Sequence, residues 1–532
     1  MSEHSTIKLS RRGLIRRGGA AAAVTAGTGL LMPYLSRAAD RPAITHGLQS
    51  GDVTAESGMV WARVSRPSRV KVEFSAVESF KSVIGGVFTD ALPESDLTAK
   101  MGMRGLPAGQ DIFYRVTPLD LADPSVLGES MTGHFRTAPA DNRTVTFTWS
   151  GDTAGQGWGI NEDWGGMKAY TTMLKHQPDF FIHSGDTVYS DGVILPEVKL
   201  KDGTIWKNIT TEEKSKPAET MAEFRGQWKY NLLDKALKEF NRQVPMFVQF
   251  DDHEVTNNWW PEEPLTRAEH LRKKYTEKFA LPLVARAHRA FHEFNPIRPD
   301  PFEPGRVYRK IGYGPNVDVF MLDMRSYRGP NGENKQTVYG PDAYFLGPVQ
   351  MAWLKRELKA SKATWKVIAA DMPISIYVMY DEDRKYGSEA VSQLDNGAPL
   401  GRELEIADLL GFMKREKIRN TVWLTADVHY TAAHWYDPSK AKSQNFDPFW
   451  EFVSGPIHAG TFGPGDLDQT FGPQLKYVKA PTKEQGRNLP PTEGLQFFGV
   501  VKVDGKTKQM TVTLRDVADQ ALWSTTIDPV RA

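Results

Sequence analysis

Phe180-Phe-Ile-His-Ser-Gly-Asp186 is a short apolar run that leads to an aspartate, and the same sequence pattern recurs along the chain. Five further runs have this arrangement and lead to Asp152, Asp251 with Asp252, Asp323, Asp371 and Asp427. Continuous apolar runs of this length are typical of strands buried on both faces of a covered sheet. Open α/β sheets place their ligand sites beyond the carboxyl ends of such strands. We therefore expect these carboxylates to gather at one edge of a sheet.

Helical stretches alternate with these apolar runs from residue 141 onward. The stretches with helical periodicity are 165–177, 218–240, 265–279, 349–360 and 401–416. Alternation of this kind indicates α/β layering. Near the end of the chain, Phe497–Val503 and Met510–Leu514 predict a hairpin.

The region before residue 141 has a different pattern of apolar residues, which predicts a separate all-β unit. Short alternating runs such as Met59–Val64 and Val70–Phe74 are bounded by Gly, Pro and Ser. We expect a small β-sandwich of about seven strands over residues 39–140, ending in the linker Thr137–Ala140.

Composition excludes several classes of site. The 532-residue chain has a formal net charge of +1, so no overall basic field attracts nucleic acid. It has no cysteine, which excludes disulfides, thiolate metal sites and a cysteine nucleophile. Any metal must therefore be held by oxygen and nitrogen ligands, which favours hard or borderline ions.

The N-terminus predicts an export signal over residues 1–38. Ser10-Arg-Arg-Gly-Leu-Ile-Arg16 is similar to the bacterial twin-arginine consensus, and a weakly apolar run, Gly18–Leu35, follows it. Ser36-Arg-Ala38 then provides a small-x-small cleavage site. We expect a periplasmic or secreted protein that uses the twin-arginine export machinery and has no permanent membrane span. The alternative is a disordered basic arm.

The aspartates that follow the apolar runs predict a metal site. Carboxylates within a few ångströms repel one another, and a multivalent cation turns that repulsion into coordination. A single aspartate after a strand is more often a turn former or a helix cap. Asp323 and Asp371 are the aspartates for which such a purely structural role is the strongest alternative. Tyr189 and His429 lie in the same loops and add further donors.

Taken in order, four motifs resemble the PhoD type of alkaline phosphatase within the metallophosphatase superfamily. They are Ser150-Gly-Asp152, Ser184-Gly-Asp-Thr-Val-Tyr189, Asp251-Asp-His-Glu-Val255 and Thr425-Ala-Asp-Val-His429. The resemblance implies a four-layer αββα sandwich over residues 141–532, preceded by the N-terminal β-sandwich. It also implies a centre that contains Fe³⁺ and Ca²⁺. A divalent ion other than Ca²⁺ at the second position is the alternative.

The resemblance further implies which residues bind the metals. Asp186 would bridge two ions, with Asp152, Tyr189 and His429 completing the first site. Asp252 and Asp427 would bind the second ion, and Asp371 falls where relatives place another ligand. Asp152 stands where the best-known members have a cysteine. The Tyr189 phenolate suits Fe³⁺, and an oxygen-rich second site suits Ca²⁺.

The expected reaction is hydrolysis of phosphate esters by attack of a metal-bound hydroxide, with His253 donating a proton to the leaving oxygen. Arg325 is either a phosphate clamp or an ion-pair partner of the acidic loops. Monoesters are the expected small-molecule substrates, and a phosphodiesterase or phospholipase is the alternative within the same chemistry. Segments 191–217 and 378–400 are expected to shape the pocket. A non-catalytic calcium-binding module is the alternative from another class.

Overall fold

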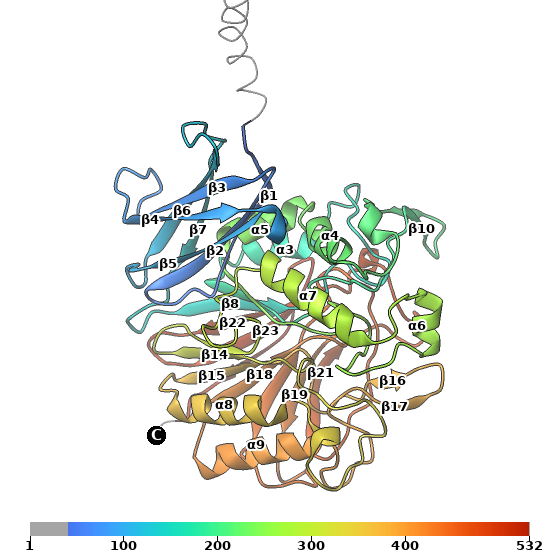
Figure 1. Ribbon diagram of the computed structural model, residues 1–532. Helices are drawn as coiled ribbons and strands as arrows, with labels where there is room; N and C mark the ends of the chain where they lie inside the picture. Colours follow the sequence, from blue (N-terminus) through green and yellow to red (C-terminus); the bar gives the residue numbers. More distant parts are fainter. Residues whose placement is uncertain (1–40, 531–532) are drawn as a thin grey trace, which may run out of the picture.

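Two β-sheets packed face to face form the centre of the computed structural model, which describes residues 41–530 (Figure 1). The first sheet has nine strands in the order β24-β23-β22-β8-β9-β12-β1-β2-β5. Its strands are β1 (Ile44–Gly51), β2 (Ser57–Val64), β5 (Thr98–Arg104), β8 (Val145–Ser150), β9 (Phe180–His183), β12 (Met246–Val248), β22 (Phe497–Val503), β23 (Met510–Asp516) and β24 (Ala521–Ile527).

The second sheet has seven strands in the order β13-β14-β15-β18-β20-β19-β21. Its strands are β13 (Arg309–Gly312), β14 (Val317–Met321), β15 (Trp365–Ala369), β18 (Thr421–Thr425), β19 (Thr431–Tyr436), β20 (Phe449–Val453) and β21 (Pro473–Lys479). Buried apolar side chains from both inner faces, among them Trp149, Phe180 and Val367, form one core between the sheets. The predicted hairpin at the chain end is confirmed, because β22 and β23 pair antiparallel.

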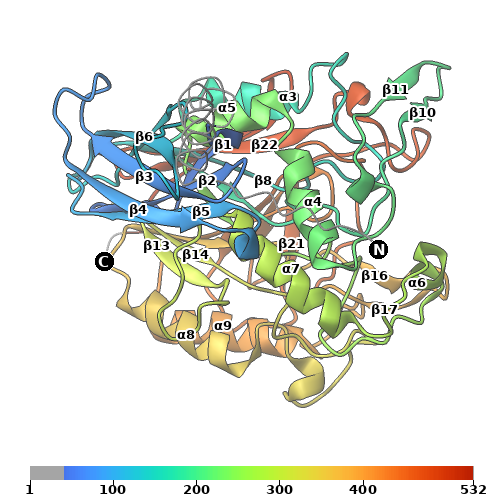
Figure 2. The same ribbon diagram turned by 45° about the horizontal axis from the view of Figure 1, so that its top comes forward.

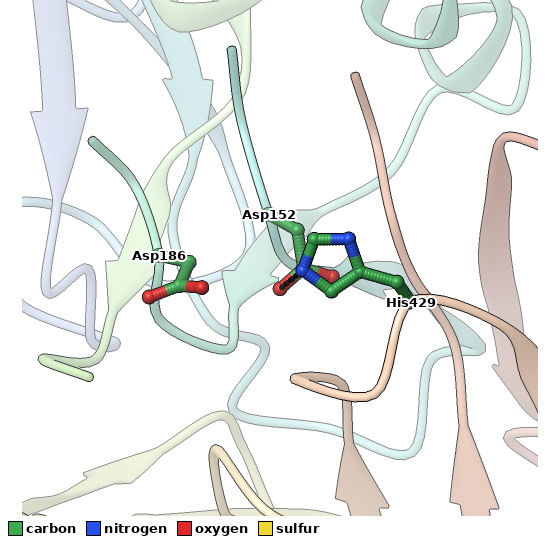
Figure 3. A group of neighbouring side chains, drawn as sticks. All are labelled: Asp152, Asp186 and His429. Atoms are coloured by element: carbon green, nitrogen blue, oxygen red, sulfur yellow. Dashed lines mark ion pairs between the residues drawn. The ribbon is translucent and has the colours of Figure 1, made fainter. Parts of the chain in front are cut away.

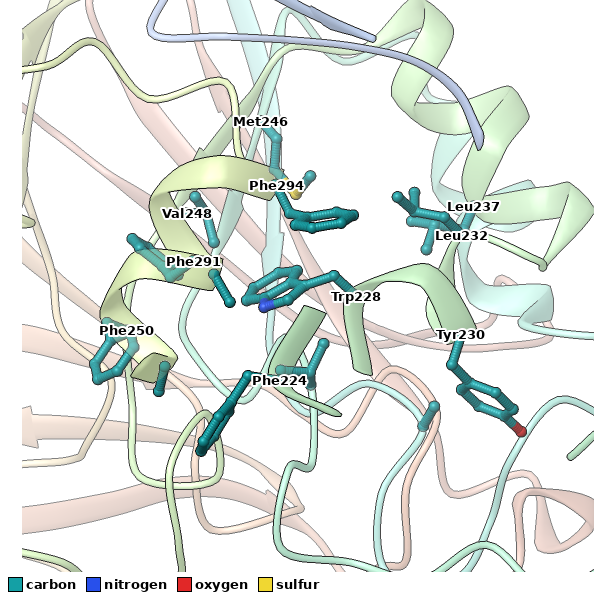
Figure 4. Close-up of a cluster of buried hydrophobic side chains, with 14 of the residues drawn as sticks. Phe224, Trp228, Tyr230, Leu232, Leu237, Met246, Val248, Phe250, Phe291 and Phe294 are labelled. Atoms are coloured by element: carbon teal, nitrogen blue, oxygen red, sulfur yellow. The ribbon is translucent and has the colours of Figure 1, made fainter. Parts of the chain in front are cut away.

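Helices cover the two outer faces (Figures 1 and 2). They are α3 (Lys168–Leu174), α4 (Met221–Asn231), α5 (Lys235–Gln243), α7 (Ala280–Phe294), α8 (Gly347–Ala360) and α9 (Glu403–Arg415). The short helix α6 (Ala268–Lys273) lies at one side of the molecule. Side chains of α3, α4, α5 and α7 share a core with the first sheet, in which Trp228 meets Phe291 at 5.9 Å between ring centres (Figure 4). Side chains of α8 and α9 share another core with the second sheet. The predicted four-layer sandwich is confirmed.

The N-terminal region forms the predicted β-sandwich. Its outer sheet has the order β4-β3-β6-β7. The strands are β3 (Ser68–Ser75), β4 (Gly85–Ala91), β6 (Asp111–Asp120) and β7 (Met131–Arg136). This sheet packs on β1, β2 and β5 through a core that includes Val60, Val72 and Phe135. Those three strands also belong to the nine-stranded sheet, because Gly51 of β1 pairs in parallel with Met246 of β12.

Two helical predictions differ from the structure. The stretch 218–240 is two helices, α4 and α5, because the Asp234 side chain accepts a hydrogen bond from the Leu237 amide at 2.8 Å and caps a new helix. Helix α7 lies in a stretch for which no helix was predicted. Its buried positions include Ala280, Leu283, Val284 and Ala287, which follow the i, i+3, i+4, i+7 pattern of an amphipathic helix.

Candidate metal centre

Six parallel strands deliver aspartates to the same edge of the facing sheets. Strands β8, β9 and β12 run parallel in the first sheet, and β14, β15 and β18 run parallel in the second. The residues that follow these strands are Asp152, Asp186, Asp251 with Asp252, Asp323, Asp371 and Asp427. Asp152, Asp186 and Asp427 have φ angles of 67°, 50° and 62°. Aspartate tolerates this left-handed region better than most residues, so the chain can turn sharply directly after the strand.

The first cluster joins Asp152, Asp186 and His429, whose ligand atoms all lie within 4.8 Å of one another (Figure 3). His429 Nδ1 lies at hydrogen-bond distance from the carbonyl oxygen of Gly460, which can only accept, so Nδ1 carries the proton. Burial lowers the pKa of His429 to about 4, so the ring is neutral. Nε2 therefore keeps its lone pair, and the Tyr189 hydroxyl lies 2.8 Å from it. Asp152, Asp186 and His429 are thus close enough together to hold one ion, and the Tyr189 hydroxyl lies beside them.

The second cluster joins Asp186, Asp252 and His253 within the same limit of 4.8 Å. Asp186 belongs to both clusters and can bridge two ions. Asp252 Oδ2 accepts a hydrogen bond from the Asn258 amide at 2.6 Å, which leaves its other oxygen for the cluster. His253 stacks on the Tyr189 ring, with 4.3 Å between ring centres.

His253 is held as a protonated group. Burial would lower the pKa of His253, but Asp191 and Asp252 outweigh that effect and raise it to about 9. Its Nδ1 atom lies 2.7 Å from Asp191 Oδ1, and its Nε2 atom lies 4.0 Å from Asp252. Asp191 also accepts a hydrogen bond from Lys273 at 2.6 Å. His253 can therefore present a proton from Nε2 at neutral pH.

Several buried carboxylate oxygens of this centre lack a hydrogen-bond partner within the described chain. They are both oxygens of Asp152, both oxygens of Asp371, Oδ2 of Asp251 and Oδ1 of Asp252. Buried polar atoms of folded proteins are otherwise almost always hydrogen-bonded. Burial and neighbouring acids also raise the pKa of Asp152 and of Asp186 well above the ordinary range. Multivalent cations would relieve both costs, so the donor set fits metal ions.

Arg325 lies against the second cluster and is fully buried among five carboxylates. Its Nε atom lies 2.6 Å from Asp251 Oδ1, and its Nη1 atom lies 2.5 Å from Glu389 Oε2. Longer contacts reach Asp427 and Asp371, each at 3.5 Å, and Asp252 at 4.0 Å. These contacts correspond to the ion-pair alternative, and a role as a phosphate clamp stays a prediction.

Asp323 and Asp371 are the two aspartates for which a purely structural role is the strongest alternative, and they differ in their surroundings. Asp323 Oδ1 accepts hydrogen bonds from the amides of Arg325 at 3.0 Å and Ser326 at 2.9 Å, which is a turn-forming role. Neither oxygen of Asp371 has a hydrogen-bond partner among the residues that the structure describes, and Oδ2 lies 3.5 Å from Arg325 Nε. Asp371 therefore remains a candidate ligand, whereas Asp323 stabilises a loop.

A cavity of about 840 Å³ opens over the two clusters. Its lining includes Asp186, Asp252, His253, Asp427 and His429. One wall comes from residues 376–383, which include β16 (Met379–Asp381), and another comes from residues 462–466. The predicted segment 378–400 thus contributes to the pocket. The segment 191–217, which contains β10 (Glu197–Lys199) and β11 (Ile205–Lys207), supplies none of the described lining residues.

Comparison with known families follows the same division of the chain. The family model of the PhoD-like phosphatase matches residues 147–514, which is most of the chain. The chain belongs to the PhoD-like phosphatase family. The model of the PhoD-like phosphatase N-terminal domain matches residues 29–139, which include the β-sandwich. The metal-binding candidates of this PhoD-like phosphatase all lie within the first match.

Individual relatives agree with this assignment. Alkaline phosphatase D from Bacillus subtilis (strain 168) is 26% identical over 460 residues, covering 80% of this chain and 71% of the relative. The solved structure of PhoD has a TM-score of 0.66 at 20% identity, covering 91% of this chain and 89% of that one. A purple acid phosphatase, PPD1 from yellow lupin (Lupinus luteus) seeds, has a TM-score of 0.53 at 12% identity, covering 92% and 74%. These structures share the fold.

Two residues of the PhoD-like centre were not anticipated from the sequence. Asp191 follows Asp186 by five residues in the same loop, but it is not preceded by a strand pattern. Glu254 lies in the Asp251–Val255 motif, and its carboxylate accepts hydrogen bonds from the amides of Asp251 at 2.8 Å and Thr187 at 2.6 Å. Glu254 thus ties the two ligand loops together.

Proposed function

We propose that this PhoD-like phosphatase hydrolyses phosphate monoesters, with diesters as a second class, at a two-metal centre. Asp152, Tyr189 and His429 would hold one ion, Asp252, Asp427 and Asp371 the other, and Asp186 would bridge them. The observation that carries the proposal is the set of unpartnered, buried carboxylate oxygens on Asp152, Asp251, Asp252 and Asp371. Asp152 and Asp251 cluster with Asp186, Asp252 and Asp427, which line one cavity. Family membership favours this enzyme over the non-catalytic calcium-binding alternative.

Metal ions bound here would supply Lewis acidity, which lowers the pKa of a coordinated water and neutralises charge on the phosphoryl group. The side chains of this protein supply the remaining functions. His253 would donate a proton to the leaving oxygen, and Asp191 holds its ring in position through the 2.7 Å contact to Nδ1. The cavity of about 840 Å³ is larger than a phosphoryl group needs and leaves room for the ester substituent.

We propose Fe³⁺ for the first site and Ca²⁺ for the second. A phenolate such as that of Tyr189 is a hard anionic donor that suits ferric iron. The proposed donors of the second site are carboxylates, and calcium prefers oxygen ligands. Metal analysis of the purified protein, with its visible absorption spectrum, tests this choice. A colourless protein that contains zinc alone would contradict it.

The first test compares 4-nitrophenyl phosphate with bis(4-nitrophenyl) phosphate, with and without added Ca²⁺. Asp186→Asn should abolish turnover of both esters, because it weakens the residue shared by the two clusters. Asp323→Asn is the matched control, since its oxygen can still accept the two loop hydrogen bonds. Faster diester turnover would make the enzyme a phosphodiesterase with the same ligands. No turnover of either ester by metal-loaded protein would overturn the proposal.

We further propose export by the twin-arginine route to the periplasm or the exterior. The proposed signal, residues 1–38, lies outside the described residues, and its support is the Arg11-Arg12 motif in the sequence. Within residues 41–530, no helix is long and apolar enough to cross a membrane. Changing Arg11 and Arg12 together to Lys should retain the precursor in the cytoplasm. Cell fractionation checks this, and unchanged export would contradict it.

A further inference from the structure

A third group of acids shares two members, Asp252 and Asp427, with the proposed second site, and all its members contact Arg325. Ligand atoms of Asp251, Asp252 and Asp427 lie within 4.8 Å of one another, as a cation site requires. The same three residues are partners of the Arg325 guanidinium, at 2.6 Å, 4.0 Å and 3.5 Å respectively. A cation bound by these acids would therefore lie within a few ångströms of a permanent positive charge.

We propose that Arg325 and the second metal ion compete for these carboxylates, so that Arg325 keeps the second site weaker than the first. The inference rests on the proposed two-metal function. A guanidinium does not lose its proton in proteins, so it cannot make way for the ion by becoming neutral. Asp152 and Asp186 of the first cluster have no guanidinium or ammonium ion pair within the described residues, so no arginine or lysine competes for that cluster.

Glu389 provides the position to which Arg325 can withdraw. It pairs with Arg325 Nη1 at 2.5 Å and lies outside the third group of acids. Its carboxylate also contacts Arg328 at 3.2 Å, and its carbonyl oxygen accepts a hydrogen bond from Arg402 at 3.0 Å. Arg325 can therefore keep one full ion pair while it releases Asp251, Asp252 and Asp427 to an incoming ion. Binding of the second ion and release of the guanidinium become one event.

The test is calorimetric titration of Ca²⁺, and separately Mn²⁺, into chelator-treated protein. The wild-type protein should show one tight and one weak class of site. In Arg325→Gln the weak class should tighten at least about ten-fold, because like charges about 4 Å apart repel by several kcal/mol even at the effective dielectric of about 20 that describes buried sites. The tight class should change by a clearly smaller factor, because this repulsion weakens as the distance from Arg325 increases. Arg325→Lys retains the charge and should stay close to wild type.

Arg328→Gln is the matched control. Arg328 lies three residues after Arg325, and in the described part of the chain its ion pair is with Glu389 and with none of the three acids. Arg328→Gln therefore removes a buried guanidinium that does not contact these acids, and the weak class should change far less than in Arg325→Gln. A weak class that is unchanged or weaker in Arg325→Gln would overturn the inference. So would two wild-type sites of equal affinity, a result that stands even where the variant does not fold. If the protein shows one tight and one weak class of site but hydrolyses neither nitrophenyl ester, the proposed function is contradicted and the inference about Arg325 is not.

Discussion

At the scale of single residues, the chemistry of the centre depends on how His253 is held. Asp191 contacts its Nδ1 atom, and Lys273 in turn anchors Asp191. Asp191 and Asp252 keep the pKa of His253 near 9 in spite of burial. The imidazolium form therefore predominates at neutral pH, with Nε2 as the available proton donor. Leaving groups that need a proton should depend on this arrangement more than those that do not.

We predict that His253→Ala lowers kcat for an alkyl phosphate by roughly 100-fold or more, the usual contribution of a general acid. The loss for 4-nitrophenyl phosphate should be much smaller, because nitrophenolate departs without a proton. Steady-state kinetics with both esters checks this. Asp191→Asn should change the two rates in the same direction by a smaller factor. Equal losses on both esters would show that His253 is not the proton donor.

At the scale of elements, the hairpin of β16 and β17 (Tyr386–Ser388) is tied to a proposed metal ligand by Asn258. The Asn258 amide donates to Asp252 Oδ2 at 2.6 Å, and its side chain donates to the carbonyl oxygens of Met379 at 3.0 Å and Tyr380 at 3.2 Å. Met379 and Tyr380 line the cavity. Asn258 therefore connects the hairpin that forms a wall of the pocket with the candidate metal ligand Asp252.

Asn258→Ala should raise KM for the bulky diester several-fold, since each lost hydrogen bond is worth about 1 kcal/mol. KM for the nitrophenyl monoester should change less, because a smaller substrate meets less of the wall. Asn257→Ala is the control, because among residues 41–530 the Asn257 side chain donates to Glu269 and to no atom of the hairpin. The same change in KM for both esters, or the same effect in the control, would contradict the coupling.

Helix α9 carries a buried acid that makes stability depend on pH. Burial, together with Asp468, raises the pKa of Glu403 from 4.5 to about 8. Because the folded-state pKa is raised, the folded protein binds the proton more tightly than the unfolded chain. This stabilisation is complete below about pH 4.5 and is lost as pH rises through 8.

Glu403→Gln should therefore raise stability at pH 9 by on the order of 2 kcal/mol, with little change at pH 5. The amide keeps an oxygen to accept the hydrogen bonds that Gln393 donates at 2.9 Å and the Leu400 amide donates at 3.2 Å. Thermal unfolding at the two pH values measures the difference. A variant that is equally destabilised at both pH values would show that the charge of Glu403 carries no cost.

At the scale of the whole molecule, the metal centre joins the two sheets. Asp152 and Asp186 follow strands of the first sheet, whereas Asp371, Asp427 and His429 follow strands of the second. Metal ions held between them would bind the folded protein and not the unfolded chain, so they would stabilise the sandwich.

We predict that removing metal with a chelator lowers Tm, and that adding metal back restores it. At a metal concentration 100 times Kd, one site contributes about 2.7 kcal/mol. Differential scanning calorimetry of the chelated and reloaded protein measures the shift. Asp152→Asn should show a reduced response, because one first-site ligand is weakened. A Tm that is independent of metal in the wild-type protein would contradict a centre shared by both sheets.

The local sequence predicted those features that depend on short-range patterns. The strand-then-aspartate runs located the six parallel strands and the carboxylates at their ends, because burial of a strand and the turn after it are encoded within a few residues. The same reasoning merged α4 and α5, since the cap at Asp234 was not recognised. It also missed α7, although its apolar spacing was present in the sequence.

Which residues meet across the centre was decided by tertiary structure. Arg325 contacts Asp251, His253 contacts Asp191, and Tyr189 contacts His429, pairs that lie 74, 62 and 240 residues apart. Their contacts depend on strand order and on the packing of one sheet against the other, including the pairing of β1 with β12. The sequence by itself therefore determined the strand ends, the aspartates that follow them and the family. Only the folded chain determined that a buried arginine lies among those ligands, because charges distant in sequence interact only once the sheets bring them together.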